Sequence, residues 1–307
     1  MRVISIQFVA VLVMLAIGQG ALSRDSYQES VTVGGLSGLK YTLLQSTDLV
    51  DWSEAEAPRI GEGEEISFGV ETALDSIFFK VRVEVHDSIT SELTTIEYPI
   101  HVYVPEGYGE STQTYPVIYA TDGQWISEGF SSAIAEKEKQ VILVTVEQGP
   151  GDRRATDYLL PGATTYFEFF TEELMPAIET VYRVDASERT ICGTSYGGLL
   201  VGLVLLMDDA EAPHFTNYLS FDGSFWTHRT ATNALEQTRF EAGNEMDVTL
   251  YLTSATGTQN NDTWVTNFKN KIESRGYSGL TVIRKSYPVE HNDVAQPSFE
   301  EALDELF

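Results

Sequence analysis

A serine between small residues is the clearest sign of chemistry in this chain. Residues 193–198 read Gly-Thr-Ser-Tyr-Gly-Gly and match the G-x-S-x-G pattern, in which a sharp turn from a strand into a helix exposes a nucleophilic serine. A short apolar run at 190–192 precedes the motif, and an unbroken apolar segment at 199–206 follows it. Small neighbours suit the strained turn, and the start of the helix favours the negative charge of acyl transfer. A glycine-rich turn at a strand end is the plain alternative, but this context predicts that Ser195 is a nucleophile.

A serine nucleophile needs a base to take its proton, and histidine is the usual one. His291 follows the last predicted strand, where the base stands when the chain order is serine, acid, histidine. The alternative for His291 is an exposed loop position, and the chain order favours the base. The other four histidines lie before or within the first core strands or beside the strand after the motif: His86, His101, His214 and His228.

The acid that would orient this histidine is less sharply defined. It should follow the strand predicted at 248–253, and between Leu252 and a helix beginning near Thr263 the sole carboxylate is Asp262. An aspartate before a helix is also a favoured N-cap, which bonds backbone amides and not a histidine. Asp222, after the preceding predicted strand, is a second candidate. We predict Asp262 as the acid with both alternatives open.

Alternating strands and helices must position these side chains. The predicted strands lie at 96–104, 117–121, 141–146, 190–192, 218–221, 248–253 and 280–287. Several of them are almost continuously apolar, as in a sheet covered on both faces. Apolar residues at three- and four-residue steps over 167–181 predict a helix, in which Pro176 predicts a kink or a late start. A second stripe of this kind spans 264–272. The pattern predicts an α/β fold with a mostly parallel sheet.

Residues 27–85 have a different texture and predict a small β-rich module before the α/β domain at 86–307. They are rich in Ser, Thr, Gly and Glu, with short alternating runs at 40–44, 65–70 and 78–85. The stretch 41–52, YTLLQSTDLVDW, resembles β-modules of secreted bacterial proteins.

The α/β part resembles the putative-esterase family of α/β-hydrolases, which includes enterochelin esterases, feruloyl and acetylxylan esterases, S-formylglutathione hydrolases and mycolyltransferases. The resemblance runs over about residues 86–295. It is carried, in family order, by segments 104–108 (VPEGY), 115–125 (YPVIYATDGQW), 154–157 (RATD), 173–176 (ELMP), 193–198 (GTSYGG), 224–226 (SFW) and 288–292 (PVEHN).

Several site residues follow from this resemblance. The backbone N–H of Tyr196, after the nucleophile, is one expected oxyanion donor, and the resemblance implies that Gln124, after Asp122-Gly123, supplies the other. The expected substrate-binding residues are Asp122, Gly123, Arg154 and Trp226. Arg154 would grip a carboxylate or catecholate and Trp226 would stack on an aromatic acyl group, although either could be structural. Some siderophore esterases of the family use a Ser–His dyad, so an acid is not required.

Charge and composition exclude several other classes. The 307 residues include 46 acidic and 19 basic ones, for a formal net charge of -27. Such a surface repels nucleic acid and anionic lipid, so neither is an expected partner. No Cys/His cluster has metal-ligand spacing and no glycine-rich phosphate loop occurs, so we expect no metal and no cofactor.

The first residues predict export. A positive charge at Arg2, an apolar stretch at 3–17 and small residues at 18–21 are the layout of a signal peptide over 1–21, with an uncleaved anchor as the alternative. The single cysteine, Cys192, has no intramolecular partner. We therefore expect a secreted or periplasmic protein.

Taken together, these features predict a serine carboxylesterase, closest to the enterochelin esterases, that acts on a small-molecule or polysaccharide-linked ester. The alternatives are a feruloyl or acetyl esterase, an acyltransferase, and a non-catalytic carbohydrate-binding or adhesion protein on a hydrolase scaffold. An intact serine motif and a correctly ordered histidine argue against the last of these.

Overall fold

The computed structural model describes residues 11–13, 27–34, 39–61, 64–72, 78–85 and 87–307. The chain divides into one compact unit of residues 1–90 and 173–182 and another of residues 91–172 and 183–307. The signal peptide predicted over 1–21 lies outside the described residues except for Val11–Val13, and His86 also lies outside them. None of the described helices is long and apolar enough to cross a membrane.

The first unit is built mainly of antiparallel strands. Strands β2 (Tyr27–Gly34) and β6 (Glu65–Thr72) form a two-stranded ribbon. A second sheet has the order β1-β7-β3-β4, with β5 also paired to β3; the bounds are β1 Val11–Val13, β3 Leu39–Ser46, β4 Ser53–Glu54, β5 Arg59–Ile60 and β7 Phe78–Val85. The core of this unit includes the buried side chains of Leu43, Phe68 and Phe79. The unit also includes β8 (Ser88–Thr90) and α4 (Met175–Val181).

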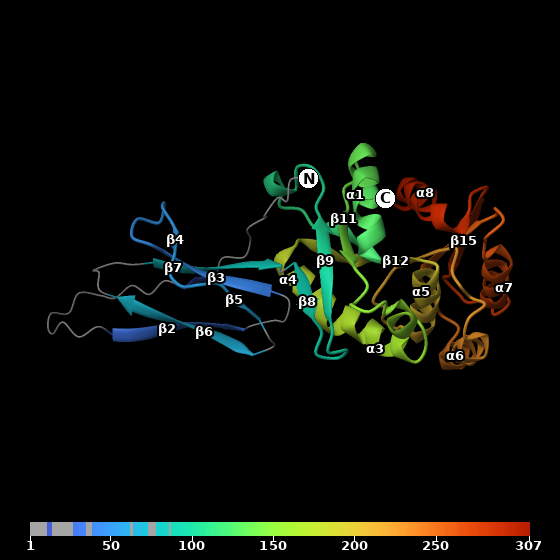
Figure 1. Ribbon diagram of the computed structural model, residues 1–307, viewed down its shortest axis with the longest axis horizontal. Coiled ribbons are helices and arrows are strands. Elements are labelled where there is room, and N and C mark those ends of the chain that lie inside the picture. Colours follow the sequence, from blue (N-terminus) through green and yellow to red (C-terminus); the bar gives the residue numbers. More distant parts are fainter. Residues whose placement is uncertain (1–10, 14–26, 35–38, 62–63, 73–77, 86) are drawn as a thin grey trace. The chain divides into compact units, whose positions relative to one another are not determined.

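The second unit holds a mostly parallel sheet in the order β15-β14-β13-β12-β10-β11-β9 (Figure 1). The strands from β10 to β15 run parallel, and β9 pairs antiparallel with β11. Their bounds are β9 Glu97–Tyr103, β10 Tyr115–Thr121, β11 Ile142–Val146, β12 Val184–Thr194, β13 Asn217–Phe221, β14 Thr249–Ala255 and β15 Thr281–Tyr287. The predicted α/β fold with a mostly parallel sheet is confirmed.

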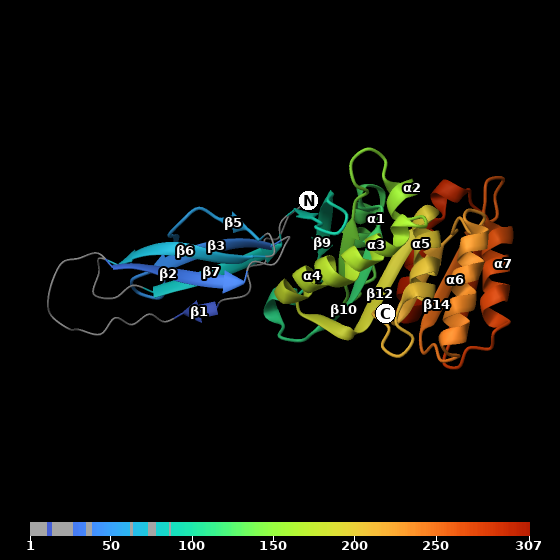
Figure 2. The same cartoon turned by 90° about the horizontal axis from the view of Figure 1, so that it is seen from below.

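Helices cover both faces of this sheet. Figure 1 places α1 (Gly123–Glu136) and α8 (Ala295–Leu306) on one face, and Figure 2, seen from below, shows α3 (Gly162–Glu168), α5 (Tyr196–Met207) and α6 (Arg229–Ala242) in front of the strands. The unit also contains the helix α7 (Asp262–Glu273) and several short elements: α2 Arg154–Asp157, the 3-10 turns Tyr108–Glu110 and His291–Asp293, and the π-helical turn Phe169–Leu174. The helical stretch expected over 167–181 is divided among α3, the π-helical turn and α4, and Pro176 was expected to kink it or delay its start. Pro176 lies in the first turn of α4, where its missing N–H costs nothing.

The core under α1 and α8 is closely packed. The rings of Phe130 and Phe299 stack with centroids 3.8 Å apart, against Ile118, Leu219 and Tyr251 of the sheet. Neighbouring strands are also aligned in register, since Cys192 of β12 pairs with Leu219, which pairs in turn with Tyr251. Because β10, β12, β13, β14 and β15 are parallel, their carboxyl ends meet at one edge, where an α/β sheet places its site.

Candidate active site

Ser195 lies in the tight turn between β12 and α5 that the motif predicts. Its backbone has φ 60° and ψ -115°, a sparsely populated conformation typical of a strained functional turn. The backbones on either side touch, because a Cβ on Gly193 would lie 2.5 Å from the carbonyl of Gly197. The turn is held from the next strand, where the Ser195 N–H donates to the carbonyl of Phe221 at 3.0 Å. Glycines at these positions therefore allow the serine to stand at the edge of the sheet.

His291 lies beside this serine. It opens a 3-10 turn (His291–Asp293) after β15, and its Nε2 is 2.9 Å from Ser195 Oγ. Its Nδ1 is 2.5 Å from Oδ2 of Asp222. A neutral imidazole whose Nδ1–H donates to this carboxylate leaves Nε2 free to accept the serine proton. The order of the elements along the chain thus places His291 beside Ser195.

The other described histidines serve different contacts. His101 lies 2.7 Å from Glu147, His214 lies 2.6 Å from Asp208, and His228 immediately precedes α6.

The acid prediction is wrong for Asp262. This residue begins α7, and its Oδ1 accepts hydrogen bonds from Ser254 Oγ and from Arg284 Nη2, each at 2.6 Å. The charged partner of this carboxylate is therefore Arg284 on β15 and not the imidazole of His291. Asp222, the second candidate, follows β13, is 0% exposed and carries the contact with His291. The carboxylate that contacts His291 thus comes one strand earlier in the chain than the order of the elements suggests.

The two expected oxyanion donors begin two helices. Tyr196 is the first residue of α5 and Gln124 the second residue of α1. N–H groups in the first turn of a helix have no intrahelical acceptor, and they point toward the positive end of the helix dipole. Since β10 and β12 are parallel neighbours, both helices start at the same edge of the sheet. The fold thus offers two backbone donors near Ser195.

The Asp122–Arg154 pair departs from the expected role. The guanidinium makes two hydrogen bonds to the carboxylate, from Nε to Oδ1 at 2.7 Å and from Nη2 to Oδ2 at 2.9 Å, and Nη2 reaches the carbonyl of Thr194 at 3.4 Å. Asp122 is 3% exposed; its burial raises the pKa of the carboxyl, and the bonds from Arg154 oppose that rise. Arg154 therefore joins the turn after β10 to the end of β12, and much of its hydrogen-bonding capacity is spent on Asp122.

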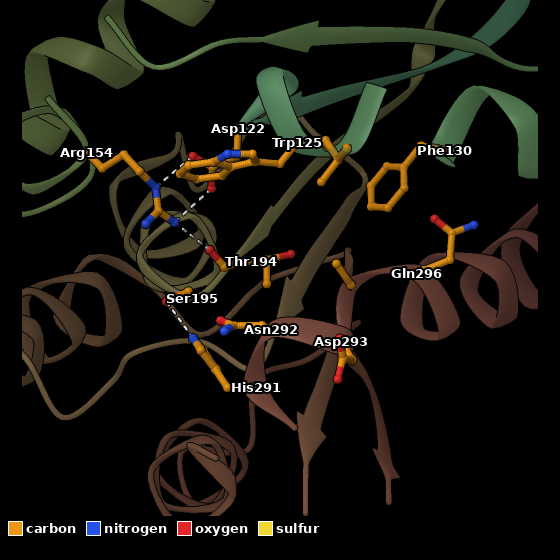
Figure 3. A pocket seen from close by; sticks show the side chains of 12 residues that line it. Asp122, Trp125, Phe130, Arg154, Thr194, Ser195, His291, Asn292, Asp293 and Gln296 are labelled. Carbon is orange, nitrogen blue, oxygen red and sulfur yellow. Dashed lines mark hydrogen bonds and ion pairs between the residues drawn. The ribbon is translucent and has the colours of Figure 1, made fainter. Parts of the chain in front are cut away.

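Two cavities open on either side of the serine and histidine. The larger, of about 600 Å³, is lined by Asp122, Arg154, Trp125 and Phe130, with residues 291–293, 295 and 296 opposite (Figure 3). The smaller, of about 410 Å³, is lined by Tyr196, Trp226 and residues 258–261. The indoles are well exposed, Trp125 by 63% and Trp226 by 46%. Each cavity therefore offers an aromatic surface beside the nucleophile.

Trp125 was not singled out in the sequence, although it stands directly after the expected oxyanion residue Gln124. Gly123, expected at the substrate, is instead buried against β11, where a Cβ would lie 3.0 Å from Thr145 Oγ1. Among the described residues, no group of three or more His, Cys, Asp or Glu side chains is placed to hold a metal ion.

Comparisons with known proteins agree with this architecture. The family model described as "Putative esterase" matches residues 91–270. Ferri-bacillibactin esterase BesA of Bacillus subtilis (strain 168) is 34% identical over 101 residues, 32% of this chain, and the match spans only 33% of that relative.

Solved structures share the fold. An IroE-like serine hydrolase from Shewanella oneidensis is 23% identical, with a TM-score of 0.64 over 72% of this chain and 78% of that one. Siderophore hydrolase EstB from Aspergillus nidulans is 18% identical, with a TM-score of 0.59 over 72% and 93% of the two chains. The family resemblance of the sequence motifs is confirmed: this chain belongs to the putative-esterase family.

Proposed function

We propose that this protein is a carboxylic ester hydrolase in which Ser195 is the nucleophile, His291 the general base and Asp222 the orienting acid. One observation carries the proposal, the unbroken chain from Ser195 Oγ through the imidazole to a fully buried carboxylate, at 2.9 and 2.5 Å. This is the geometry that nucleophilic acyl transfer requires.

The reaction has two stages. Ser195 Oγ attacks the ester carbonyl as its proton passes to Nε2 of His291, and the carbonyl oxygen becomes an oxyanion that accepts hydrogen bonds from the N–H groups of Tyr196 and Gln124. When this intermediate collapses, the C–O bond to the alcohol breaks and the alcohol takes the proton from His291. A water then attacks the acyl-enzyme and gives its proton to His291. When this second intermediate collapses, the bond between the acyl carbon and Ser195 Oγ breaks, Oγ takes the proton back from His291, and the acid leaves.

For the substrate, we propose an ester with an aromatic group, with a catecholate siderophore lactone as the first candidate. The name of the Bacillus subtilis relative, a ferri-bacillibactin esterase, supports this choice. The exposed indoles of Trp125 and Trp226 support it as well, since ring stacking contributes about 0.5–1.5 kcal/mol beyond the buried area. The same surfaces suit a feruloyl ester on a polysaccharide, which is the second candidate. The N-terminal layout supports export as part of this proposal.

Turnover of p-nitrophenyl acetate tests the hydrolase. The mature protein should release nitrophenolate, while Ser195→Ala and His291→Ala should not exceed the rate without enzyme by more than about 10³–10⁴-fold. An inactive wild-type protein, or a histidine variant that keeps full activity, would overturn the proposal. A panel of catechol-lactone, feruloyl and acetyl-xylan esters then ranks the substrates by kcat/KM.

A further inference from the structure

The segment that follows β14, residues 256–261, holds no acid directed at the imidazole, although the chain order places the acid there. This segment nevertheless contacts both Asp222 and His291. We propose that this segment is a clamp that fixes Asp222 and His291 relative to each other, and that Asn261 is its central positioning residue. The inference rests on the proposed function.

Asn261 contacts Asp222 through both its backbone N–H and its side-chain amide. Its backbone N–H donates to both carboxylate oxygens of Asp222, at 3.0 and 3.2 Å. Its side-chain Nδ2 donates to the Asp222 carbonyl at 2.8 Å and reaches Ser224 Oγ at 3.5 Å. Ser224 Oγ in turn lies 3.3 Å from Ser195 Oγ. Asn261 is only 8% exposed, so these contacts compete little with water.

An ordinary helix cap does not explain this asparagine. Asn261 occupies the N-cap of α7, where an asparagine oxygen usually accepts an N–H of the first turn, yet its side chain makes no such bond. The amide nitrogen is directed to Asp222 instead. Asp222 has a positive φ of 43°, a conformation that a non-glycine residue holds only when its surroundings support it. The Asn261 side chain supplies that support at the Asp222 carbonyl.

The same segment holds the histidine by its backbone. The N–H of His291 donates to the carbonyl of Gln259 at 2.9 Å. The carboxylate of Glu290, the residue before His291, accepts the N–H groups of Thr258 at 3.0 Å and Gln259 at 2.8 Å. These backbone bonds lower the pKa of Glu290. A Cβ on Gly257 would lie 2.7 Å from Glu290 Oε1 and from the carbonyl of Val289, so the two loops lie in close contact.

The clamp makes the alignment of the triad depend on Asn261. Without its side-chain amide, Asp222 loses the bond to its carbonyl and can turn away from Nδ1 of His291. A carboxylate that is held less firmly stabilises the protonated imidazole less well. Asn261 lines the smaller cavity and not the larger one, and its amide is bonded to Asp222 and Ser224. The effect should therefore fall mainly on kcat and leave KM for a small ester nearly unchanged.

The test compares Asn261→Ala and Asn261→Ser with wild-type protein. Serine remains a preferred N-cap residue, so Asn261→Ser keeps the helix start if the alanine variant folds poorly. Asn270→Ala makes the matched substitution at an exposed position near the end of α7. For p-nitrophenyl acetate we expect kcat to fall about 10- to 100-fold in both Asn261 variants, the range for a lost hydrogen bond to a charged or buried group. KM should change less than about twofold, and Asn270→Ala should match wild type.

Two further readouts separate positioning from a structural role. The acid limb of the kcat/KM profile should move to lower pH in the Asn261 variants, and the low-field proton resonance of His291 Nδ1–H should weaken or shift. The clamp is wrong, and the esterase proposal stands, if the wild-type enzyme is active and both Asn261 variants behave like it. In that case their kcat lies within twofold of wild type, and neither the acid limb of the pH profile nor the low-field resonance moves. A loss of thermal stability with unchanged kcat in the folded fraction also overturns the clamp. An inactive wild-type protein refutes the proposed function instead.

Discussion

Replacing Asp222 with asparagine isolates the electrostatic part of the triad, because the two side chains have almost the same shape. The carboxylate is fully buried and lies 2.5 Å from Nδ1 of His291. An asparagine amide either presents its NH₂ to Nδ1 or accepts one weaker, neutral hydrogen bond. In the first case the imidazole carries its proton on Nε2, so Nε2 cannot accept the proton of Ser195.

The expected magnitude follows from this geometry. The wrong tautomer together with the loss of a buried charge beside the imidazolium removes about 4–5.5 kcal/mol of transition-state stabilisation, as in serine proteases with the same substitution. We therefore expect kcat for p-nitrophenyl acetate to fall about 10³- to 10⁴-fold in Asp222→Asn, with a far smaller change in KM.

Asp262→Asn is the matched control. It makes the same chemical change at the residue that the chain order favoured, but there it disturbs only a partly exposed pair with Arg284 and a bond from Ser254. Such a pair contributes about 0–1 kcal/mol to stability, so the kcat of Asp262→Asn should stay within about threefold of wild type. Initial rates of both purified variants decide the matter, with circular dichroism to verify folding. The reasoning is refuted if Asp222→Asn stays within tenfold of wild type, or if Asp262→Asn loses as much activity.

Three other properties follow from the described contacts. Arg154→Met should lower the free energy of unfolding in urea by about 3–5 kcal/mol because it leaves the Asp122 carboxylate buried without its partner, and adding Asp122→Asn should restore part of that loss; unchanged stability would instead favour an arginine reserved for substrate. Burial raises the pKa of the Cys192 thiol, so DTNB should label it only in denaturant, and rapid labelling of the native protein would contradict its burial. The folded-state pKa of Glu290 is lowered, so its stabilising contribution is present above the unfolded pKa of about 4.3 and is lost as the pH falls through the folded value. Thermal melts at pH 7 and pH 4 should therefore show a smaller acid-induced loss for Glu290→Gln than for wild type, and equal losses would exclude this contribution.

The positions of Ser195 and His291 side by side could be predicted because their signals are local or ordered. The glycines around Ser195 are required by backbone contacts within the turn itself, and the apolar run at 199–206 fits a helix buried almost throughout. His291 follows from the order of strands along the chain, which a parallel sheet converts into position along one edge.

The acid could not be chosen from chain order, because two neighbouring strand ends each carry an aspartate. What separates them is Arg284, which lies 22 positions after Asp262 and approaches it only when β15 pairs with β14. Within the part of the chain that the structure describes, no Lys or Arg side chain pairs with the carboxylate of Asp222, which is held by Asn261. These are contacts between distant segments, and a single sequence does not rank them.

Element boundaries show the same limit. The strand expected at 190–192 is the apolar part of β12, which extends back to Val184 through mostly polar residues that pattern reading does not recognise as a strand. Arg154 shows this limit as well, because a guanidinium near a cleft suggests an anion site until its own buried partner, Asp122, is seen.

The most direct test of the central claim is covalent labelling of the serine. The mature protein is incubated with a fluorophosphonate and its intact mass and peptide masses are measured, alongside Ser195→Ala. We predict one phosphonyl adduct per chain, located on the peptide that contains Ser195, and no adduct on the alanine variant. A native protein that stays unlabelled, or an alanine variant labelled to the same extent, would contradict the assignment of Ser195 as the nucleophile.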